Sequence, residues 1–171
     1  MKNNFKTPRL LIDELRESDA EFILELVNTS GWLEFIGDRN INDKDKAIAY
    51  IKKIIENPLI NYWLVRTIDH KTTLGVITLI KRDYLEYHDI GFAFLPQFSG
   101  NGYAYESTQF ILNEILSEQV YEKVLATTLQ ENYRSISLLE KLGMKFQKEI
   151  INEDQKLLIF CIEKKLSNFL Q

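Results

Sequence analysis

The feature that most constrains the fold of this 171-residue chain is a loop with two glycines, Gly100 and Gly102, between a strand-like and a helix-like run. Glycine adopts backbone angles that other residues avoid, so neighbouring N–H groups in such a loop can point toward one place. A helix that begins directly after the loop adds its unbonded first-turn N–H groups and the positive end of its dipole. The segment Phe94–Ala104 therefore predicts a binding site for an anion such as a phosphate or diphosphate.

Two familiar phosphate-binding motifs do not fit this loop. A P-loop requires Lys followed by Ser or Thr after its last glycine, whereas Gly102 is followed by Tyr103 and Ala104. A dinucleotide fingerprint needs a third small residue where this chain has Tyr105. The loop contains no Lys or Arg, and no Asp or Glu lies from Leu95 through Tyr105. Main-chain amides are therefore expected to carry most of the anion binding.

The composition is that of an ordinary globular protein, with 45% hydrophobic and 27% charged residues. The net charge of -4 argues against general nucleic-acid binding, which needs a basic surface. One cysteine excludes an internal disulfide, and with only two histidines beside it no metal site is expected. The sequence shows neither the apolar core of a secretory signal nor an apolar run long enough to span a membrane. We expect a single cytoplasmic domain over residues 1–171.

Hydrophobic periodicity predicts about seven strands, at residues 9–14, 62–68, 73–81, 88–95, 123–129, 146–151 and 156–164. Helices are predicted after Ser18 or Asp19, from Asp43 to Asn57-Pro58, at about 103–117 and at 132–142, where Gly143 ends the last one. Residues 32–42 are predicted to form a loop. The expected fold class is α+β (mixed α/β), with a twisted, mostly antiparallel mixed central sheet and helices on both of its faces.

Two motifs resemble those of a known family. The segment Gln97–Ala104 resembles the Gln/Arg-x-x-Gly-x-Gly/Ala motif of the GNAT family of N-acetyltransferases. Residues 132–144 are similar to that family's later Asn-x-x-Ser-x-x-Leu-x-Glu-Lys-Leu-Gly-Phe segment, with Met144 in place of the phenylalanine. The opening Thr7-Pro8-Arg9-Leu10 is similar to that of the ribosomal-protein-alanine acetyltransferase-like branch. Since the element order also agrees over nearly the whole chain, a GNAT-like fold is expected.

The resemblance implies that acetyl-coenzyme A is the cosubstrate and that the loop and following helix hold its diphosphate. Asn101 stands where the family often has Lys or Arg, which removes one phosphate contact. A backbone N–H of Phe94 or Leu95 is expected to meet the oxyanion, at a bulge that family members have in this strand. The cofactor-binding residues that the resemblance implies are Phe94, Leu95, Gln97, Phe98, Ser99, Gly100, Asn101, Gly102, Tyr103, Ala104 and Asn132.

The implied reaction is direct transfer of an acetyl group from a thioester to an amine. An alkylamine has a pKa of about 10, so a base or a water chain must take its proton at neutral pH. Asp89 is the preferred base, because on a regular strand it shares a face with the small residues Gly91 and Ala93. The alternative for Asp89 is a solvated carboxylate at a sheet edge, and Glu86 and His88 are the next candidates.

The resemblance also implies an acid for the leaving thiolate, with Ser135 preferred and Tyr133 as the second candidate. The alternative for this motif is helix capping, since Asn132 is a good N-cap residue. Cys161 could suggest a covalent acetyl-cysteine, but its apolar surroundings in the sequence favour a buried structural thiol.

The acceptor is expected to enter along residues 31–39, with Trp32 and Arg39 as substrate-contacting candidates. Core packing remains the alternative for Trp32, while Arg39 is free to pair with Asp38 or Glu34 or to bind an acidic acceptor. The expected acceptor is a protein N-terminus or a small amine, and the chain is expected to be a monomer or homodimer. The alternatives to an enzyme are a non-catalytic acyl-coenzyme A-binding or sensing domain and an interaction domain whose glycine loop is structural.

Overall fold

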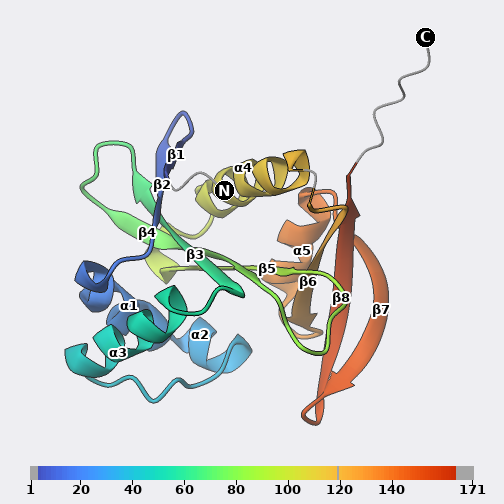
Figure 1. Cartoon of the computed structure of the whole chain (residues 1–171), viewed down its shortest axis with the longest axis horizontal. Coiled ribbons are helices and arrows are strands. Elements are labelled where there is room, and N and C mark those ends of the chain that lie inside the picture. Colours follow the sequence, from blue (N-terminus) through green and yellow to red (C-terminus); the bar gives the residue numbers. More distant parts are fainter. Residues whose placement is uncertain (1–3, 119, 165–171) are drawn as a thin grey trace.

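The centre of the molecule is an eight-stranded sheet in the order β1-β2-β3-β4-β5-β6-β8-β7 (Figure 1). The computed structural model describes residues 4–118 and 120–164. All neighbouring strands are antiparallel except β5 and β6. The strands are β1 (Asn4–Lys6), β2 (Leu10–Glu14), β3 (Ile60–Thr67), β4 (Thr73–Ile80), β5 (Asp89–Phe94), β6 (Lys123–Leu129), β7 (Lys145–Asn152) and β8 (Gln155–Glu163).

Helices cover both faces of this sheet, which confirms the predicted fold class (Figure 1). None of the helices in the described part of the chain is long and apolar enough to cross a membrane. The helices are α1 (Ala20–Val27), α2 (Ser30–Phe35), α3 (Lys44–Ile55), α4 (Tyr103–Ser117) and α5 (Tyr133–Lys141), with short 3-10 turns at Glu17–Asp19 and Pro96–Phe98.

Two elements differ from the prediction. Strand β1 is additional, and its three residues are too few to show an alternating pattern. Helix α2 occupies part of the segment predicted as a loop; it is six residues long and contains Gly31, which lowers helix propensity. Its start is fixed by Thr29, whose side chain accepts a hydrogen bond from the Trp32 N–H.

The two faces of the sheet bury separate clusters of side chains. Ile90, Phe92 and Phe94 of β5 join the cluster that contains the apolar side chains of α4 and α5. Ala93, two residues after Gly91, packs with the cluster of α1, α2 and α3 instead. Because side chains alternate along a strand, Asp89, Gly91 and Ala93 share the face toward α1–α3. We call this side of β5 the acceptor face, after the acceptor that is expected to enter along residues 31–39.

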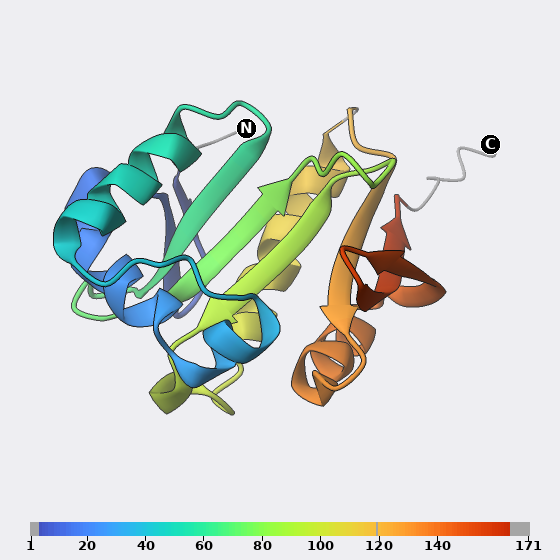
Figure 2. The ribbon, with the colours of Figure 1, turned by 90° about the horizontal axis from the view of Figure 1, so that it is seen from below.

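Strands β5 and β6 pair at one point and then part. Asp89 is opposite Leu125, and the Leu125 N–H donates to the His88 carbonyl over 2.9 Å. No further β5–β6 residue pair is formed in the described chain, and the two strands diverge toward the loop before α4 and the start of α5 (Figure 2). We call residues 90–94 of β5 and 126–129 of β6 the parted strands.

Candidate active site

The loop before α4 has the backbone that its glycines predict. After the 3-10 turn at Pro96–Phe98, Gly100 and Gly102 adopt φ values of 80° and 77°, in the left-handed region. Gly102 is the N-cap of α4, and no side chain caps this helix. Phe98 packs against both buried clusters and so fastens the loop to the sheet.

The loop presents a run of unbonded main-chain donors. The N–H groups of Phe98 and Ser99 turn back to the carbonyls of Leu95 and Pro96. In contrast, the N–H groups of residues 100–105 donate to no acceptor within the part of the chain that the structure describes. Together with the positive end of the 15-residue helix α4, these donors form a site suited to a phosphate or diphosphate.

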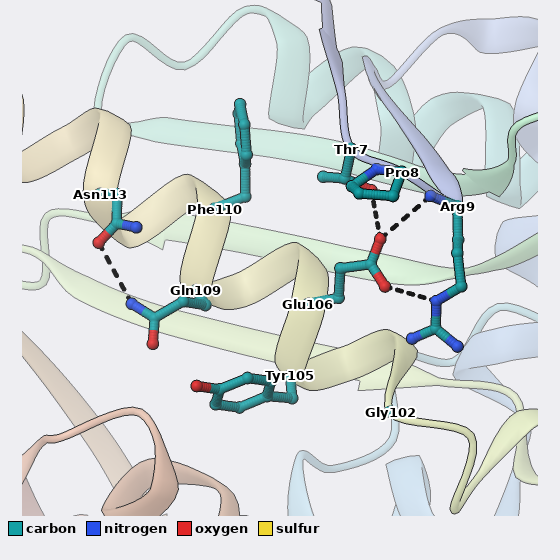
Figure 3. A pocket seen from close by; sticks show the side chains of 9 residues that line it. All are labelled: Thr7, Pro8, Arg9, Gly102, Tyr105, Glu106, Gln109, Phe110 and Asn113. Carbon is teal, nitrogen blue, oxygen red and sulfur yellow. Dashed lines mark hydrogen bonds and ion pairs between the residues drawn. The ribbon is translucent and has the colours of Figure 1, made fainter.

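Arg9 ties this loop to the first turn of α4, a role that the sequence reasoning missed (Figure 3). Its Nε donates to Glu106 Oε2 over 2.6 Å, and its Nη1 donates to the Asn101 carbonyl over 3.0 Å. The Thr7 hydroxyl donates to Glu106 Oε1 over 2.6 Å, and the Arg9 guanidinium lies 4.8 Å from the centre of the Tyr103 ring. Arg9 therefore neutralises the nearest carboxylate of α4 and holds the loop in place.

The Glu106 carboxylate should give the protein a measurable acid sensitivity. Burial alone would raise the pKa of Glu106, but the hydrogen bonds from Thr7 and Arg9 outweigh it and lower the pKa below 4.5. The ionised form thus stabilises the fold at higher pH, and this contribution is lost as the pH falls below about 4.5 and through the folded-state pKa. In thermal melts at several pH values, Glu106→Gln should lower the Tm at pH 7 and reduce the difference from wild type in acid. Glu114→Gln on the same helix is the control, and a Tm difference at Glu106 that stays constant with pH would contradict this assignment.

A cavity of about 430 Å³ lies along α4 beside the loop (Figure 3). It begins at Gly102 and Arg9, so one end reaches the N-terminus of α4. It includes no residue of β5 or β6, so it is separate from the parted strands. The lining residues are Thr7, Pro8, Arg9, Gly102, Tyr105, Glu106, Gln109, Phe110 and Asn113.

Asp89 is buried at the point where β5 and β6 part, so its interpretation as a solvated edge carboxylate is wrong. The residue is 3% exposed, and its carboxylate accepts from Arg82 Nε over 2.6 Å and from the Thr127 N–H over 2.9 Å. Burial raises the pKa of Asp89, while the Arg82 charge and the Thr127 hydrogen bonds oppose that shift. The sequence could not show this, because Arg82 and Thr127 reach Asp89 from a turn and from a neighbouring strand.

At the end of β5, the N–H group of Phe94, and not that of Leu95, faces the space between β5 and β6. The Leu95 N–H donates to the Leu74 carbonyl of β4 over 2.9 Å, so it is not free to meet an oxyanion. Hydrogen-bonding direction alternates along an antiparallel strand, so the Phe94 N–H points toward the side from which β6 has diverged. The β4–β5 register runs unbroken from Ile80–Asp89 to Gly75–Phe94, so the bulge expected near Phe94 is not formed with β4.

The second motif places its residues at the start of α5. The Asn132 side chain accepts from the Ser135 N–H over 3.1 Å, so capping is one role of Asn132. Ser135 is half-buried, whereas Tyr133 is 74% exposed. Figure 2 shows the start of α5 and the loop before α4 at the same end of the parted strands, one on each side. Lys141 of α5 lies 4.6 Å from the Tyr105 ring of α4 and links the two helices.

The remaining candidates fall into buried and exposed groups. Trp32 is 4% exposed, and its indole N–H donates to the Gly37 carbonyl over 3.1 Å, so it packs inside the α1–α3 cluster. Arg39 is exposed and forms no ion pair with another described residue. Cys161 is buried among Leu85, Leu125 and Ile159, and burial raises the pKa of its thiol.

Comparisons with known proteins agree with this geometry. A family model described as "Acetyltransferase (GNAT) domain" matches residues 9–145. The chain is 27% identical over 139 residues, 81% of each protein, to YnaD, an uncharacterized N-acetyltransferase of Bacillus subtilis (strain 168).

Two solved structures show the same fold at low sequence identity. Spermidine N-acetyltransferase from Vibrio cholerae, in complex with CoA and spermine, has a TM-score of 0.79 at 18% identity over 92% of this chain and 97% of that one. The ribosomal-protein-S5-alanine acetyltransferase of Vibrio fischeri has a TM-score of 0.78 at 13% identity over 96% and 98%. The family model covers most of the chain and the fold agrees with it, so this protein belongs to the GNAT family of N-acetyltransferases.

Proposed function

We propose that this protein transfers an acetyl group directly from acetyl-coenzyme A to a primary amine, either at a peptide or protein N-terminus or on a small amine. The observation that carries the proposal is the position of the unbonded N–H groups of residues 100–105 beside the unpaired edge of β5. The N–H groups suit the diphosphate of the cosubstrate. The free strand edge suits the amide-containing arm that ends in the thioester.

The residues of the loop and of β5 supply binding and oxyanion stabilisation in this proposal. Main-chain amides of residues 100–105, which are unbonded in the described chain, hold the diphosphate, and Asn132 adds a polar contact from α5. As the amine nitrogen attacks the thioester carbonyl, negative charge collects on the carbonyl oxygen. The Phe94 N–H donates to that oxygen. A preorganised donor of this kind stabilises a transition state by about 3 kcal/mol.

Two further residues handle protons. The amine must lose a proton as the C–N bond forms, and Asp89 on the acceptor face is our candidate to receive it. Because both Asp89 oxygens already accept hydrogen bonds from Arg82 and Thr127, the proton would pass through an intervening water. The C–S bond then breaks, and Ser135, with Tyr133 as the second candidate, would donate a hydrogen bond or proton to the leaving thiolate.

The structural likenesses support an amine acceptor without naming one. The two enzymes of similar fold are a spermidine N-acetyltransferase and a ribosomal-protein-alanine acetyltransferase, and their acceptors span the small amines and the protein N-termini proposed here. Residues 31–39 border the acceptor face, with Arg39 as the candidate contact. The buried Trp32 would hold this segment in place through the hydrogen bond from its indole N–H to the Gly37 carbonyl.

A thiol-release screen tests the function directly. The chain is incubated with acetyl-coenzyme A and panels of N-terminal peptides, polyamines, amino sugars, aminoglycosides and amino acids, and free coenzyme A is measured. We expect release that depends on one acceptor class. Thermal stabilisation by acetyl-coenzyme A without release for any acceptor would favour the non-catalytic binding or sensing domain. No binding of coenzyme A would favour an interaction domain.

Replacing Ser135 with Ala should slow the chemical step more than it weakens cosubstrate binding. A positioned acid contributes about 10²-fold or more to a rate, so kcat should fall about 10²-fold while the KM for acetyl-coenzyme A changes by less than about threefold. Ser137→Ala is the matched control, because Ser137 lies two residues later on α5 and is exposed. Equal losses in kcat and in acetyl-coenzyme A affinity for Ser135→Ala would assign this serine to positioning instead.

A further inference from the structure

A row of side chains crosses the sheet on the acceptor face. Tyr62 of β3 is opposite Thr78 of β4, and Thr78 is opposite Gly91 of β5. A Cβ at Gly91 would lie 2.7 Å from Thr78 Oγ1, so this position accepts only glycine without a shift of its neighbour. The row therefore leads from an uncovered stretch of β5 to the phenol of Tyr62.

The phenol at the end of this row is a neutral hydrogen-bond donor. The hydroxyl of Tyr62 lies 3.3 Å from that of Tyr50 on α3, and either can donate to the other. Burial, and next the neighbouring Tyr50, raises the pKa of Tyr62 well above its ordinary value of 10.0. Tyr62 thus keeps its proton at any physiological pH and can donate a hydrogen bond to an anionic group.

The positive charges of two guanidinium groups, which come from different segments, act on the same phenol. The positive charges of Arg39, after α2, and Arg82, after β4, both act to lower the pKa of Tyr62. The charge of Arg82 is offset by Asp89, which is 2.6 Å away. The charge of Arg39 is offset by no ion pair among the described residues.

The loop that carries Arg39 is held in place by its own contacts. The Trp32 indole N–H donates to the Gly37 carbonyl, and Gly37 has a φ of 101°, in the region that favours glycine. Arg39 Nη1 lies 3.6 Å from the place that a Cβ at Gly37 would occupy. Asp38 turns its carboxylate back to the Asn40 N–H, over 2.7 Å.

In the part of the chain that the structure describes, no three acidic side chains gather into a site that could hold a metal cation. Asp89 is buried and paired with Arg82, and Glu34 is exposed on α2. Burial raises the pKa of Tyr84, and the negative charge of Glu153 raises it further. A polyamine needs several carboxylates to replace its hydration, whereas a carboxylate needs a guanidinium and a neutral donor. Arg39 and Tyr62 supply the second set.

We propose that the acceptor amine also carries a carboxylate, which Arg39 and Tyr62 bind while the amine lies over Gly91. This inference rests on the proposed function, because it names the acceptor class of that same site. It distinguishes this chain from the spermidine N-acetyltransferase whose fold it shares. Two sources carry the required chemistry, namely an ω-amino acid, whose carbon chain separates the amine from the carboxylate, and a peptide with an acidic residue near its N-terminus.

Matched acceptor pairs test this directly through kcat/KM for thiol release. In the first pair, 5-aminovalerate is compared with 1,4-diaminobutane, so that a carboxylate replaces an ammonium on the same carbon chain. In the second pair, Ser-Glu-Ala amide is compared with Ser-Gln-Ala amide. We expect the carboxylate member to be preferred by at least about tenfold in one pair, and that pair identifies the source. Equal rates within both pairs, or a preference for the diamine, would overturn the proposal.

Variants of Arg39 test whether the preference for carboxylate-bearing acceptors depends on this residue. Arg39→Gln should abolish the preference, so that the two members of the pair react with about equal kcat/KM, because the KM for the carboxylate acceptor rises. The KM for acetyl-coenzyme A should stay within about twofold of the wild-type value. Arg39→Lys should recover part of the preference, and the exposed α3 variant Lys53→Gln is the control for loss of a surface charge. A full preference in Arg39→Gln would overturn the role of Arg39.

A binding measurement separates this inference from the proposed function. Calorimetry with coenzyme A present measures acceptor binding even if no turnover occurs. Carboxylate binding that is lost in Arg39→Gln would support the site even where the thiol-release screen fails. Absence of binding by either carboxylate acceptor, or equal binding of the diamine, would overturn the site.

Discussion

Replacing Gly100 with Ala is expected to raise the KM for acetyl-coenzyme A at least about tenfold, equivalent to about 1.4 kcal/mol of lost binding. Gly100 has a φ of 80°, which a residue with a Cβ avoids at a cost of about 1 kcal/mol. A loop that relaxes toward negative φ turns its N–H groups away from their common point. The Cβ also enters space that is empty in the protein and that the diphosphate is proposed to border. Steady-state kinetics and calorimetry measure the change.

Gly143 provides a matched control for this substitution. It follows α5 and has a φ of 83°, and a Cβ there would also have no atom within 4 Å. Gly143→Ala should therefore cost similar stability in a thermal melt while leaving the KM for acetyl-coenzyme A within about twofold. If both variants raise this KM equally, the effect at Gly100 reflects general strain and not contact with the diphosphate.

Replacing Asp89 with Ala is expected to lower the free energy of unfolding by about 3–5 kcal/mol, because removing one partner leaves a half-buried guanidinium uncompensated. Arg82 loses its 2.6 Å ion pair, and the Thr127 N–H loses its acceptor where β6 joins β5. Turnover should be lost as well, since these strands hold the thioester in the proposed reaction. Denaturant unfolding and thiol release measure the two losses.

An exposed ion pair with a similar separation serves as the comparison for the effect of burial on the free energy of unfolding. Lys44 and Glu21 lie 2.7 Å apart with side chains 58% and 79% exposed, so solvent screens their attraction and Glu21→Ala should change the free energy of unfolding very little. A cost at Asp89 no larger than that at Glu21 would contradict the structural role of the buried pair.

The Asp89→Asn variant separates the structural role from proton transfer. Asn keeps an oxygen that can accept from the Thr127 N–H but cannot take a proton from the amine. We expect lower kcat/KM in a protein that remains folded. In the wild type, activity should fall in acid as the pH drops through the Asp89 pKa, which burial raises. This limb should be absent or moved in Asp89→Asn; unchanged kinetics would remove Asp89 from the reaction.

Elements with long, regular patterns were predictable from the sequence. The 103–117 helix was predicted with its observed bounds, because Ile111, Leu112 and Ile115 recur at helical spacing after the Gly102 start. Strand β1 and helix α2 were missed, since three and six residues give too little periodicity to recognise. Elements of this kind are fixed by neighbours in space: β1 pairs with β2, and α2 packs through buried Trp32.

The site was predictable where it depends on consecutive residues. The loop backbone follows from Gly100 and Gly102, and the cap at Asn132 follows from its place before α5. Contacts between distant segments were not predictable. Arg9 lies 97 residues before Glu106, and Asp89 lies 38 residues before Thr127, so neither contact leaves a local pattern.

The most direct test is a crystal structure of the chain with acetyl-coenzyme A bound. We expect the diphosphate to accept hydrogen bonds from N–H groups of residues 100–105 and the thioester to lie beside Phe94, between β5 and β6. A diphosphate bound elsewhere, with these N–H groups left in water, would contradict the proposed reaction site.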